Sequence, residues 1–213
     1  GIKNIKVKKI PNIIFFSTGN EISNKNNIPF WKVRDSHSSY IQSLRSSFLF
    51  NLKNGGILKD KDKVVFQNKI KKMINSKIDI MITTGAVSAG KFDYIPNIVK
   101  KFKTSNYFKS VMIKPGKPLL FAKIQKKILF SLPGNPISTA ACFRFFIYPF
   151  IEKILDLPTE KPIKAVLLNN FEKKKSFTRF IKSKLSTTKD GKLNVKLLSG
   201  QESFKTKPFV KSN

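Results

Sequence analysis

The chain contains 213 residues, 40% of them hydrophobic, and carries a formal net charge of +30. No uninterrupted apolar run approaches the roughly 18 to 20 residues of a membrane-spanning helix, which argues against a membrane protein. The one cysteine, Cys142, excludes a disulfide framework and a CxxC metal site, and it lies in an apolar run typical of a core. Such cysteine usage favours a reducing compartment, most simply the cytoplasm.

The positive charge has two interpretations. Nucleic-acid binding through phosphate contacts is one of them. The other is a skewed composition, because the lysines are spread over the whole chain and arginine occurs only at Arg34, Arg45, Arg144 and Arg179. Base-reading proteins rely on arginine, so specific nucleic-acid recognition is the weaker hypothesis. Anionic small-molecule substrates, attracted by a positive field, are at least as consistent.

The first elements predict the start of an α/β domain. Residues 3–9 alternate weakly, as in an edge strand or a linker. Residues 12–22 form an apolar strand that ends with Glu21 at its carboxyl end, where open α/β sheets place ligands. A solvated loop carboxylate is the alternative for Glu21. Asp35 or Ser36 then caps a helix whose apolar spacing reaches Phe48. The only histidine, His37, falls in its first turn, where we expect it to bond locally or to a ligand.

Residues 54–56 (NGG) predict a turn, with a short strand from Ile57, and residues 66–74 predict a helix capped by Asp62. An apolar run, IDIMI, then leads as a buried strand into residues 83–96, TTGAVSAGKFDYIP. Here Pro96 opens a short helix, and the loop before it carries Gly85, Ser88, Gly90 and Asp93. A strand, a glycine loop and a helix in this order can form an anion pocket, although plain αβ turns share the pattern.

Three strand-like runs follow, at 108–113, 119–124 and 127–132, and the last two can pair as a hairpin through residues 125–126. Between the first two, a proline–glycine turn displays Lys114 and Lys117. The PGNP sequence then predicts Asn135 as the N-cap and Pro136 as the first residue of a buried helix over 137–155, which Pro149 should kink or divide.

The element order predicts a three-layer α/β domain with helices on both faces of the sheet. A linker at 157–162 divides the chain into domains 1–157 and 158–213. The second domain shows short strands at 164–168, 177–185 and 193–197, an Asp190-Gly191 hairpin turn, and a last strand-like run before PFVKSN. Because so few strands are marginal alone, and the chain begins with Gly1, we expect a piece of a longer or processed chain.

Several motifs together carry a family resemblance. TTGAVSAGKFDYIP, IKPGKPLLFAK and LPGNPIS, in this order and spacing, resemble the molybdopterin molybdenumtransferases, the family of bacterial MoeA and the gephyrin E domain. STGNEI, DSHS, SFTRFIKSKL and SGQESFKTKPFVKSN fit the same pattern. The resemblance covers nearly the whole chain.

The resemblance implies a molybdopterin-binding (MoaB/Mog-like) α/β domain followed by an incomplete C-terminal β-barrel domain. The family inserts molybdate into adenylylated molybdopterin, gives molybdenum cofactor and releases AMP, with Mg²⁺ as the divalent cation. Family members are homodimers whose active site includes N-terminal domains of the partner subunit. The resemblance therefore implies that this chain need not be active alone.

The resemblance also assigns residues. Asp93 and Glu21 are the implied catalytic and Mg²⁺-binding carboxylates. Lys114 and Lys117 would attract molybdate and phosphate as point charges. The implied substrate-binding positions are Gly85, Ser88, Gly90, Asp35, Ser36, Pro133, Asn135 and Pro136. The chain departs from the family at Asn20, His37 and Ala86, and a non-glycine residue at Ala86 should need an ordinary backbone conformation.

Two other functions stay open. A molybdopterin adenylyltransferase (Mog-like) shares the α/β core, but the β tail and the VSAGKFDY block favour the molybdenumtransferase. A CinA-type domain would carry a GPT-x-DD loop at 87–93, which this chain lacks. The non-enzymatic alternative is a basic nucleic-acid-binding module.

Overall fold

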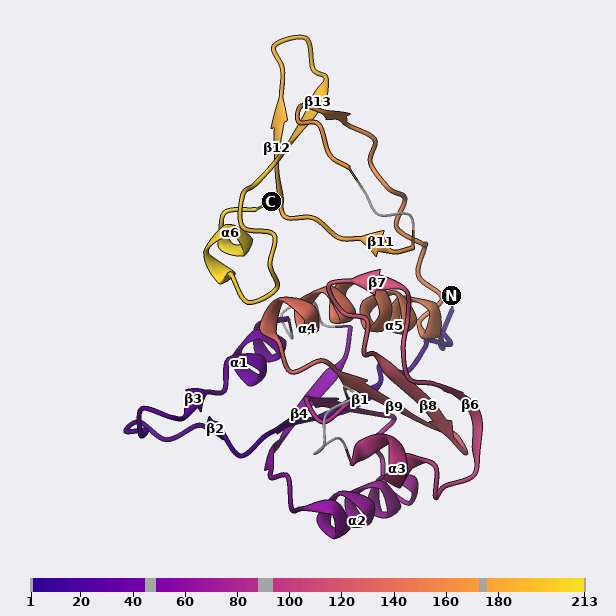
Figure 1. Ribbon diagram of the computed structural model, residues 1–213. Coiled ribbons are helices and arrows are strands. Elements are labelled where there is room, and N and C mark those ends of the chain that lie inside the picture. The colour runs from indigo at the N-terminus through magenta and orange to yellow at the C-terminus, as the bar shows by residue number, and fades with distance from the viewer. Residues whose placement is uncertain (1, 45–48, 88–93, 173–175, 213) are drawn as a thin grey trace.

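The structure is a computed structural model that describes residues 2–44, 49–87, 94–172 and 176–212 (Figure 1). Within these residues, six strands form one mixed sheet in the order β4-β1-β5-β9-β8-β6. Four neighbouring strands are parallel: β4 (Asn51–Leu58), β1 (Asn12–Thr18), β5 (Ile80–Thr84) and β9 (Lys127–Leu132). Two antiparallel strands complete one side: β8 (Leu120–Ile124) and β6 (Thr104–Phe108).

Helices cover both faces of this sheet, which confirms the predicted three-layer α/β fold (Figure 1). One face packs against α1 (Ser36–Ser43) and a long helix made of α4 (Pro136–Cys142), the π-helical turn η2 (Phe143–Ile147) and α5 (Tyr148–Ile154). The other face packs against α2 (Lys63–Ile74) and α3 (Ile95–Val99). In β5, Ile80 and Ile82 face the first core and Met81 the second, as strand alternation requires. Cys142 is fully buried in the first core, as predicted.

The predicted turn at residues 54–56 is wrong, because β4 runs through both glycines. The pairing of β1 with β4 shifts between Phe15 and Ser17, so that Gly55 and Gly56 lie opposite Phe16. A Cβ atom on Gly55 would lie 2.2 Å from the Phe16 ring. The glycine pair therefore marks a bulge at which a ring crosses the neighbouring backbone.

The predicted strand at 108–113 is also wrong. Strand β6 ends at Phe108, and the next strand is the short β7 (Ile113–Lys114). The residues between them turn, with the Val111 N–H donating to the Lys117 carbonyl at 3.0 Å. The hairpin of β8 and β9 is confirmed, with Gln125 at the turn in a left-handed conformation of φ 55.

Proline divides the long helix as expected. Pro149 has no N–H to donate and crowds the carbonyl of Phe145, and the π-helical turn over Phe143–Ile147 lies directly before α5. The helix continues to Ile154 in spite of this change of hydrogen-bond pattern.

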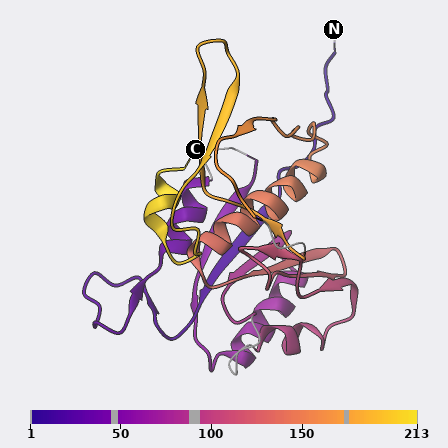
Figure 2. The same cartoon turned by 45° about the horizontal axis from the view of Figure 1, so that its top comes forward.

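The C-terminal segment lies over α4 and α5, on the side away from the sheet (Figures 1 and 2). Strands β10 (Val166–Leu167), β13 (Leu193–Leu197) and β12 (Ser183–Thr187) form a small sheet, and β12 and β13 make the predicted hairpin. The single strand predicted at 177–185 is instead β11 (Thr178–Arg179) followed by β12. The strand-like run predicted before PFVKSN is wrong: residues 201–205 carry no strand, and helix α6 (Thr206–Val210) begins where the run should end. The barrel and the boundary at 157/158 stay predictions.

Two extended segments leave the body of the domain. Residues 2–11 carry neither helix nor strand (Figure 2), which favours the linker interpretation. Lys8 forms an exposed ion pair with Asp156 at 2.6 Å. Strands β2 (Ile22–Ser23) and β3 (Val33–Arg34) pair at the base of a protruding arm. None of the described helices is long and apolar enough to cross a membrane.

The close approach at Gly55 gives a stability prediction. Gly55→Ala should lower the free energy of unfolding by about 1–3 kcal/mol, because the added methyl group meets the Phe16 ring. The same change in a Phe16→Leu background should cost less, since leucine leaves room for the methyl group. Urea unfolding of the four proteins measures this coupling, and an equal cost in both backgrounds would contradict the packing argument.

Candidate ligand site

The carboxyl ends of the parallel strands meet at one edge of the sheet, where tight turns bring backbone amides together. The Gly19 N–H donates to the Leu58 carbonyl at 3.0 Å, and the Gly85 N–H donates to the Leu132 carbonyl at 2.9 Å. Gly85 has φ 78, and a Cβ there would lie 2.7 Å from Thr18 Oγ1. These turns therefore place the start of the glycine loop directly against the end of β1.

The expectation for Ala86 is wrong. Its φ is 54, a left-handed conformation immediately after the left-handed Gly85. An L-residue in this region costs roughly 1–2 kcal/mol. The loop therefore holds two consecutive unusual residues where it leaves β5. Its predicted ligands Ser88, Gly90 and Asp93 lie outside the described residues.

The PGNP turn lies beside this loop. Asn135 is the N-cap of α4, as predicted, and its side chain accepts from the Ile137 N–H at 3.3 Å. Pro136 occupies the first turn, and Thr139 Oγ1 donates to the Pro133 carbonyl at 2.6 Å. Gly134 approaches so closely that a Cβ on it would lie 3.5 Å from the Gly85 Cα. The structure thus brings the predicted residues Gly85, Pro133, Asn135 and Pro136 together.

The start of α1 closes another side of the edge. Asp35 is its N-cap, and its Oδ1 accepts from the Ser38 N–H at 3.0 Å and from Ser17 Oγ at 2.7 Å. These two bonds tie α1 to β1, so the Asp35 carboxylate holds the frame of the edge. Ser36, the first residue of α1, is exposed.

Glu21 also lies at this edge, at the predicted position after β1. It is exposed, and its carboxylate folds back over the preceding turn, where a Cβ on Gly19 would lie 2.5 Å from either oxygen. Lys59 Nζ stabilises the same turn by donating to the Ile22 carbonyl at 3.0 Å and the Gly19 carbonyl at 3.4 Å.

Two buried polar atoms at this edge have no hydrogen-bond partner within the described part of the chain, His37 Nε2 and Thr84 Oγ1. Thr84 is 1% exposed and His37 is 6% exposed. Burial lowers the pKa of His37 from 6.5, and Asp35, a backbone hydrogen bond to Gly134 and Glu21 oppose that shift. An unsatisfied buried polar atom costs roughly 1–3 kcal/mol, so this edge retains bonding capacity at the expense of stability.

The two lysines of the proline–glycine turn lie beside a part of the tail. Strand β11 pairs in parallel with β7, with Arg179 opposite Lys114. The Thr178 N–H donates to the Met112 carbonyl at 2.9 Å, and the Phe180 N–H donates to the Lys114 carbonyl at 3.0 Å. A pocket of about 290 Å³ results, whose lining includes Lys114, Lys117, Arg179 and Ser138 of α4.

Arg179 is the basic-pocket residue that sequence reasoning did not single out. One signal was present, because arginine is rare in this lysine-rich chain and a planar guanidinium suits an oxyanion. Its position, however, depends on the pairing of β11 with a strand about sixty residues earlier.

A buried lysine fixes the segment next to this pocket. Lys182 Nζ donates to the carbonyls of Gly200, Glu202 and Lys205 at 2.6, 3.0 and 3.1 Å. Gln201 bonds both backbone groups of Lys182, accepting from its N–H at 2.9 Å and donating to its carbonyl at 2.7 Å. Burial lowers the pKa of Lys182. Lys182 thus holds Gln201 and Glu202 in place as part of the pocket wall.

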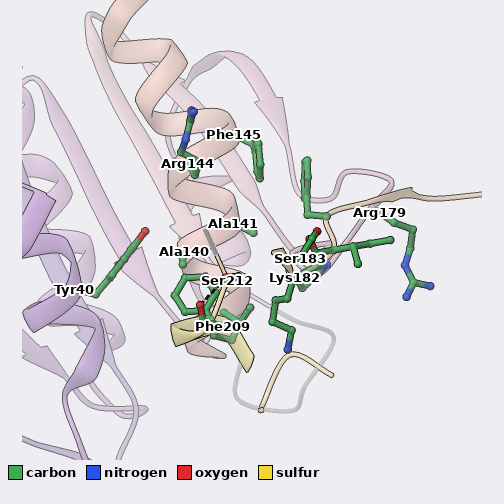
Figure 3. Close-up of a pocket in the computed structure, with 14 residues that line it drawn as sticks. Tyr40, Ala140, Ala141, Arg144, Phe145, Arg179, Lys182, Ser183, Phe209 and Ser212 are labelled. Atoms are coloured by element: carbon green, nitrogen blue, oxygen red, sulfur yellow. Dashed lines mark hydrogen bonds between the residues drawn. The ribbon is translucent and has the colours of Figure 1, made fainter. Parts of the chain in front are cut away.

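A larger cavity of about 530 Å³ adjoins the basic pocket (Figure 3). The two share Pro115, Arg179 and Phe180 in their linings. The structure therefore offers a strand-end edge built from tight backbone turns, a basic pocket and an aromatic cavity. Within the described part of the chain, no three His, Cys, Asp or Glu residues gather to hold a metal ion.

A three-layer α/β domain with glycine turns and helix starts at its strand ends defines the class of this protein. A model of the family described as "Probable molybdopterin binding domain" matches residues 14–153. The chain belongs to this family. The match confirms the predicted fold class, and with the relatives below it confirms the resemblance to molybdopterin molybdenumtransferases.

Curated relatives carry that name. The molybdopterin molybdenumtransferase of Staphylococcus aureus (strain COL) is 34% identical over 194 residues, which are 90% of this chain and 46% of the relative. That of Staphylococcus epidermidis (strain ATCC 12228 / FDA PCI 1200) is 38% identical over 115 residues, or 53% of this chain and 27% of the relative. At 46%, the chain spans about half the length of the Staphylococcus aureus relative.

Solved structures share the fold. The molybdopterin biosynthesis moeA protein of Pyrococcus horikoshii OT3 superposes with a TM-score of 0.70 at 23% identity, covering 98% of this chain and 49% of that protein. The molybdopterin biosynthesis enzyme MoaB of Thermus thermophilus superposes with a TM-score of 0.53 at 10% identity, covering 69% of this chain and 98% of that protein.

The buried imidazole predicts a pH dependence. Because the folded pKa of His37 lies below 6.5, the unfolded chain binds more protons between those two values. His37 should therefore make stability fall as the pH drops from 6.5 toward the folded pKa. His37→Gln should remove this slope in urea unfolding between those pH values. NMR titration of the single histidine measures the folded pKa directly, and a value at or above 6.5 would contradict the prediction.

Proposed function

We propose that this chain supplies the molybdopterin-binding part and the tail of a molybdopterin molybdenumtransferase. The reaction inserts molybdate into adenylylated molybdopterin, gives molybdenum cofactor and releases AMP. The observation that carries the proposal is the pairing of β11 with β7, which adds Arg179 to Lys114 and Lys117 in one basic pocket. The similarity to named molybdenumtransferases, which extends over 90% of this chain, supports it.

The basic pocket suits a tetrahedral oxyanion such as molybdate. Lys114 and Lys117 are exposed ammonium groups that attract an anion as point charges, and the Arg179 guanidinium offers paired N–H donors. Ser138 adds a hydroxyl from the first turn of α4. The net charge of +30 increases the local concentration of such anions.

The strand-end edge suits the phosphate-bearing substrate. The positive end of α4, which begins after Asn135, would attract an anion there, with Pro133 and Pro136 as rigid walls. Ser88 and Gly90 extend the loop that begins at Gly85. His37 Nε2 and Thr84 Oγ1, which have no partner among the described residues, support a role in binding, because a ligand or a bound water would satisfy them. Asp35 and Ser36 contribute by setting the start of α1.

We assign Mg²⁺ to the carboxylates of Glu21 and Asp93, which are hard oxygen ligands. Glu21 is exposed at the strand-end edge. Substrate oxygens would complete the coordination sphere of the Mg²⁺ ion. Bound Mg²⁺ would supply charge neutralisation for the phosphoanhydride that links AMP to molybdopterin. The two carboxylates would hold the ion and orient that linkage relative to the anion captured by the lysines.

We further propose that the working enzyme is a cytoplasmic homodimer of a longer chain. The Staphylococcus aureus relative is about twice as long as its matched part, which supports further domains in the working enzyme. The adenylyltransferase alternative accounts for the MoaB-like core but gives no role to Arg179, which comes from the tail. Dispersed lysines give nucleic-acid binding no comparable site.

Charge removal tests the basic pocket. Lys114→Ala and Lys117→Ala should each weaken molybdate binding by roughly ten- to a hundredfold, because a charged hydrogen bond contributes roughly 1.5–3 kcal/mol. Lys100→Ala, an exposed change at the end of α3, is the matched control and should leave affinity unchanged. Isothermal titration with molybdate measures all three. Equal affinities for the wild type and both pocket variants would reject the pocket.

Asp93→Asn tests the assigned carboxylate. In the full-length enzyme it should abolish metal insertion, because a neutral amide is a poor Mg²⁺ ligand, and the circular dichroism spectrum should not change. Formation of molybdenum cofactor from adenylylated molybdopterin and molybdate is the assay. Normal turnover by this variant would remove Asp93 from the mechanism.

A further inference from the structure

The cavity of about 530 Å³ lies where the tail meets the α/β domain (Figure 3). Tyr40 lines the cavity from α1, and Arg179 lines it from the tail. The long helix contributes Ala140, Arg144 and Phe145. Phe209 of α6 forms a further part of the wall. Its volume falls in the range of roughly 300–1,000 Å³ that small-ligand sites occupy.

Aromatic side chains and two alanines line this cavity. The rings of Phe145 and Phe180 stack with centroids 3.8 Å apart and an angle of 6°. Phe145 remains 45% exposed although it is a large apolar side chain. Ala140 and Ala141 leave room beside this stack where larger side chains would fill the interface. The cavity is therefore shaped for a flat, largely apolar group.

Two arginines line the cavity, Arg144 and Arg179. The Arg144 guanidinium forms an ion pair with Glu160 at 2.5 Å, with both side chains about half exposed, and lies 5.7 Å from the ring centroids of Phe145 and Tyr148. Such exposed pairs contribute roughly 0–1 kcal/mol, so Arg144 can exchange Glu160 for a ligand. Burial raises the pKa of Tyr40, and the positive charge of Arg144 opposes that rise. Lys182 is occupied by three carbonyls.

The cavity and the basic pocket are neighbours. Arg179, Phe180 and Pro115 line both, so a ligand in the cavity lies beside the pocket that Lys114 and Lys117 line. The aromatic cavity and the basic pocket differ in chemistry. A molecule that matches both has a flat ring at one end and an anion at the other.

We propose that this cavity binds the heteroaromatic ring of a phosphate-bearing ligand, with the ring beside Tyr40, Phe145 and Phe180 and the phosphate at Arg179. A nucleotide and a pterin phosphate share this chemistry. The inference rests on the proposed function, in which both groups are parts of one substrate, and it assigns a ring site that is distinct from the strand-end edge.

Titration calorimetry on the full chain tests the site with AMP, 6-hydroxymethylpterin phosphate, adenosine and molybdate as separate probes. At least one of the two phosphate-bearing probes should bind, and adenosine should bind about tenfold more weakly than AMP if the nucleotide is the ligand, since it lacks the charged contact. The stronger of the two phosphate probes identifies the source of the ring.

Substitutions in the cavity test whether the preferred probe binds there. Ala141→Phe, which fills the cavity, and Arg144→Gln, which removes its charge, should each weaken the preferred probe about tenfold. Glu160→Gln is the matched control: it breaks the same ion pair but keeps the guanidinium, so affinity should hold or improve. If Ala141→Phe does not fold, the exposed Arg144 and Glu160 variants decide alone.

Molybdate separates this inference from the proposed function. The cavity variants should leave molybdate affinity unchanged, because Lys114 and Lys117 lie outside the cavity. Ring binding without any molybdate binding would reject the proposed function and keep the ring site. Failure of both phosphate probes to bind, or equal losses in Arg144→Gln and Glu160→Gln, would overturn the ring site.

Discussion

Two backbone hydrogen bonds across β7 and β11 bring the tail into the wall of the basic pocket. They run from Thr178 to the Met112 carbonyl and from Phe180 to the Lys114 carbonyl, and they fix the tail against the proline–glycine turn. The stack of Phe145 on Phe180 adds apolar contact at the same junction. Without this pairing, Lys114 and Lys117 would be two exposed lysines on a turn. With it, they share a pocket with Arg179, and the aromatic cavity gains its second wall.

At the strand-end edge, locally unfavourable features are offset by the hydrogen bonds and buried strands around them. Left-handed Ala86 and two buried polar atoms without a partner among the described residues cost stability. The Asp35 carboxylate and the buried β1, β5 and β9 strands offset that cost by holding the edge rigid. A rigid frame that carries local strain and unused bonding capacity is what a preorganised ligand site requires.

Local chemistry made much of this predictable. Strands β1, β5, β8 and β9 and the caps Asp35 and Asn135 follow from apolar runs and capping rules over a few residues. The features that the sequence did not predict are determined by residues distant in the sequence. Gly55 and Gly56 signal a turn unless Phe16 is known to lie against them, and the place of Arg179 depends on pairing with a strand that is distant in the sequence. The sequence thus predicted the residues of the strand-end edge and the two lysines of the basic pocket. It did not predict that the tail adds Arg179 to that pocket, or that a cavity lies beside it.

The most direct measurement is a crystal structure of the chain soaked in molybdate, with data collected for the anomalous signal of molybdenum. The account predicts an anomalous peak within contact distance of Lys114, Lys117 and Arg179, with the tail still paired to β7. A peak bound elsewhere, or a structure in which Arg179 lies away from the two lysines, would contradict it.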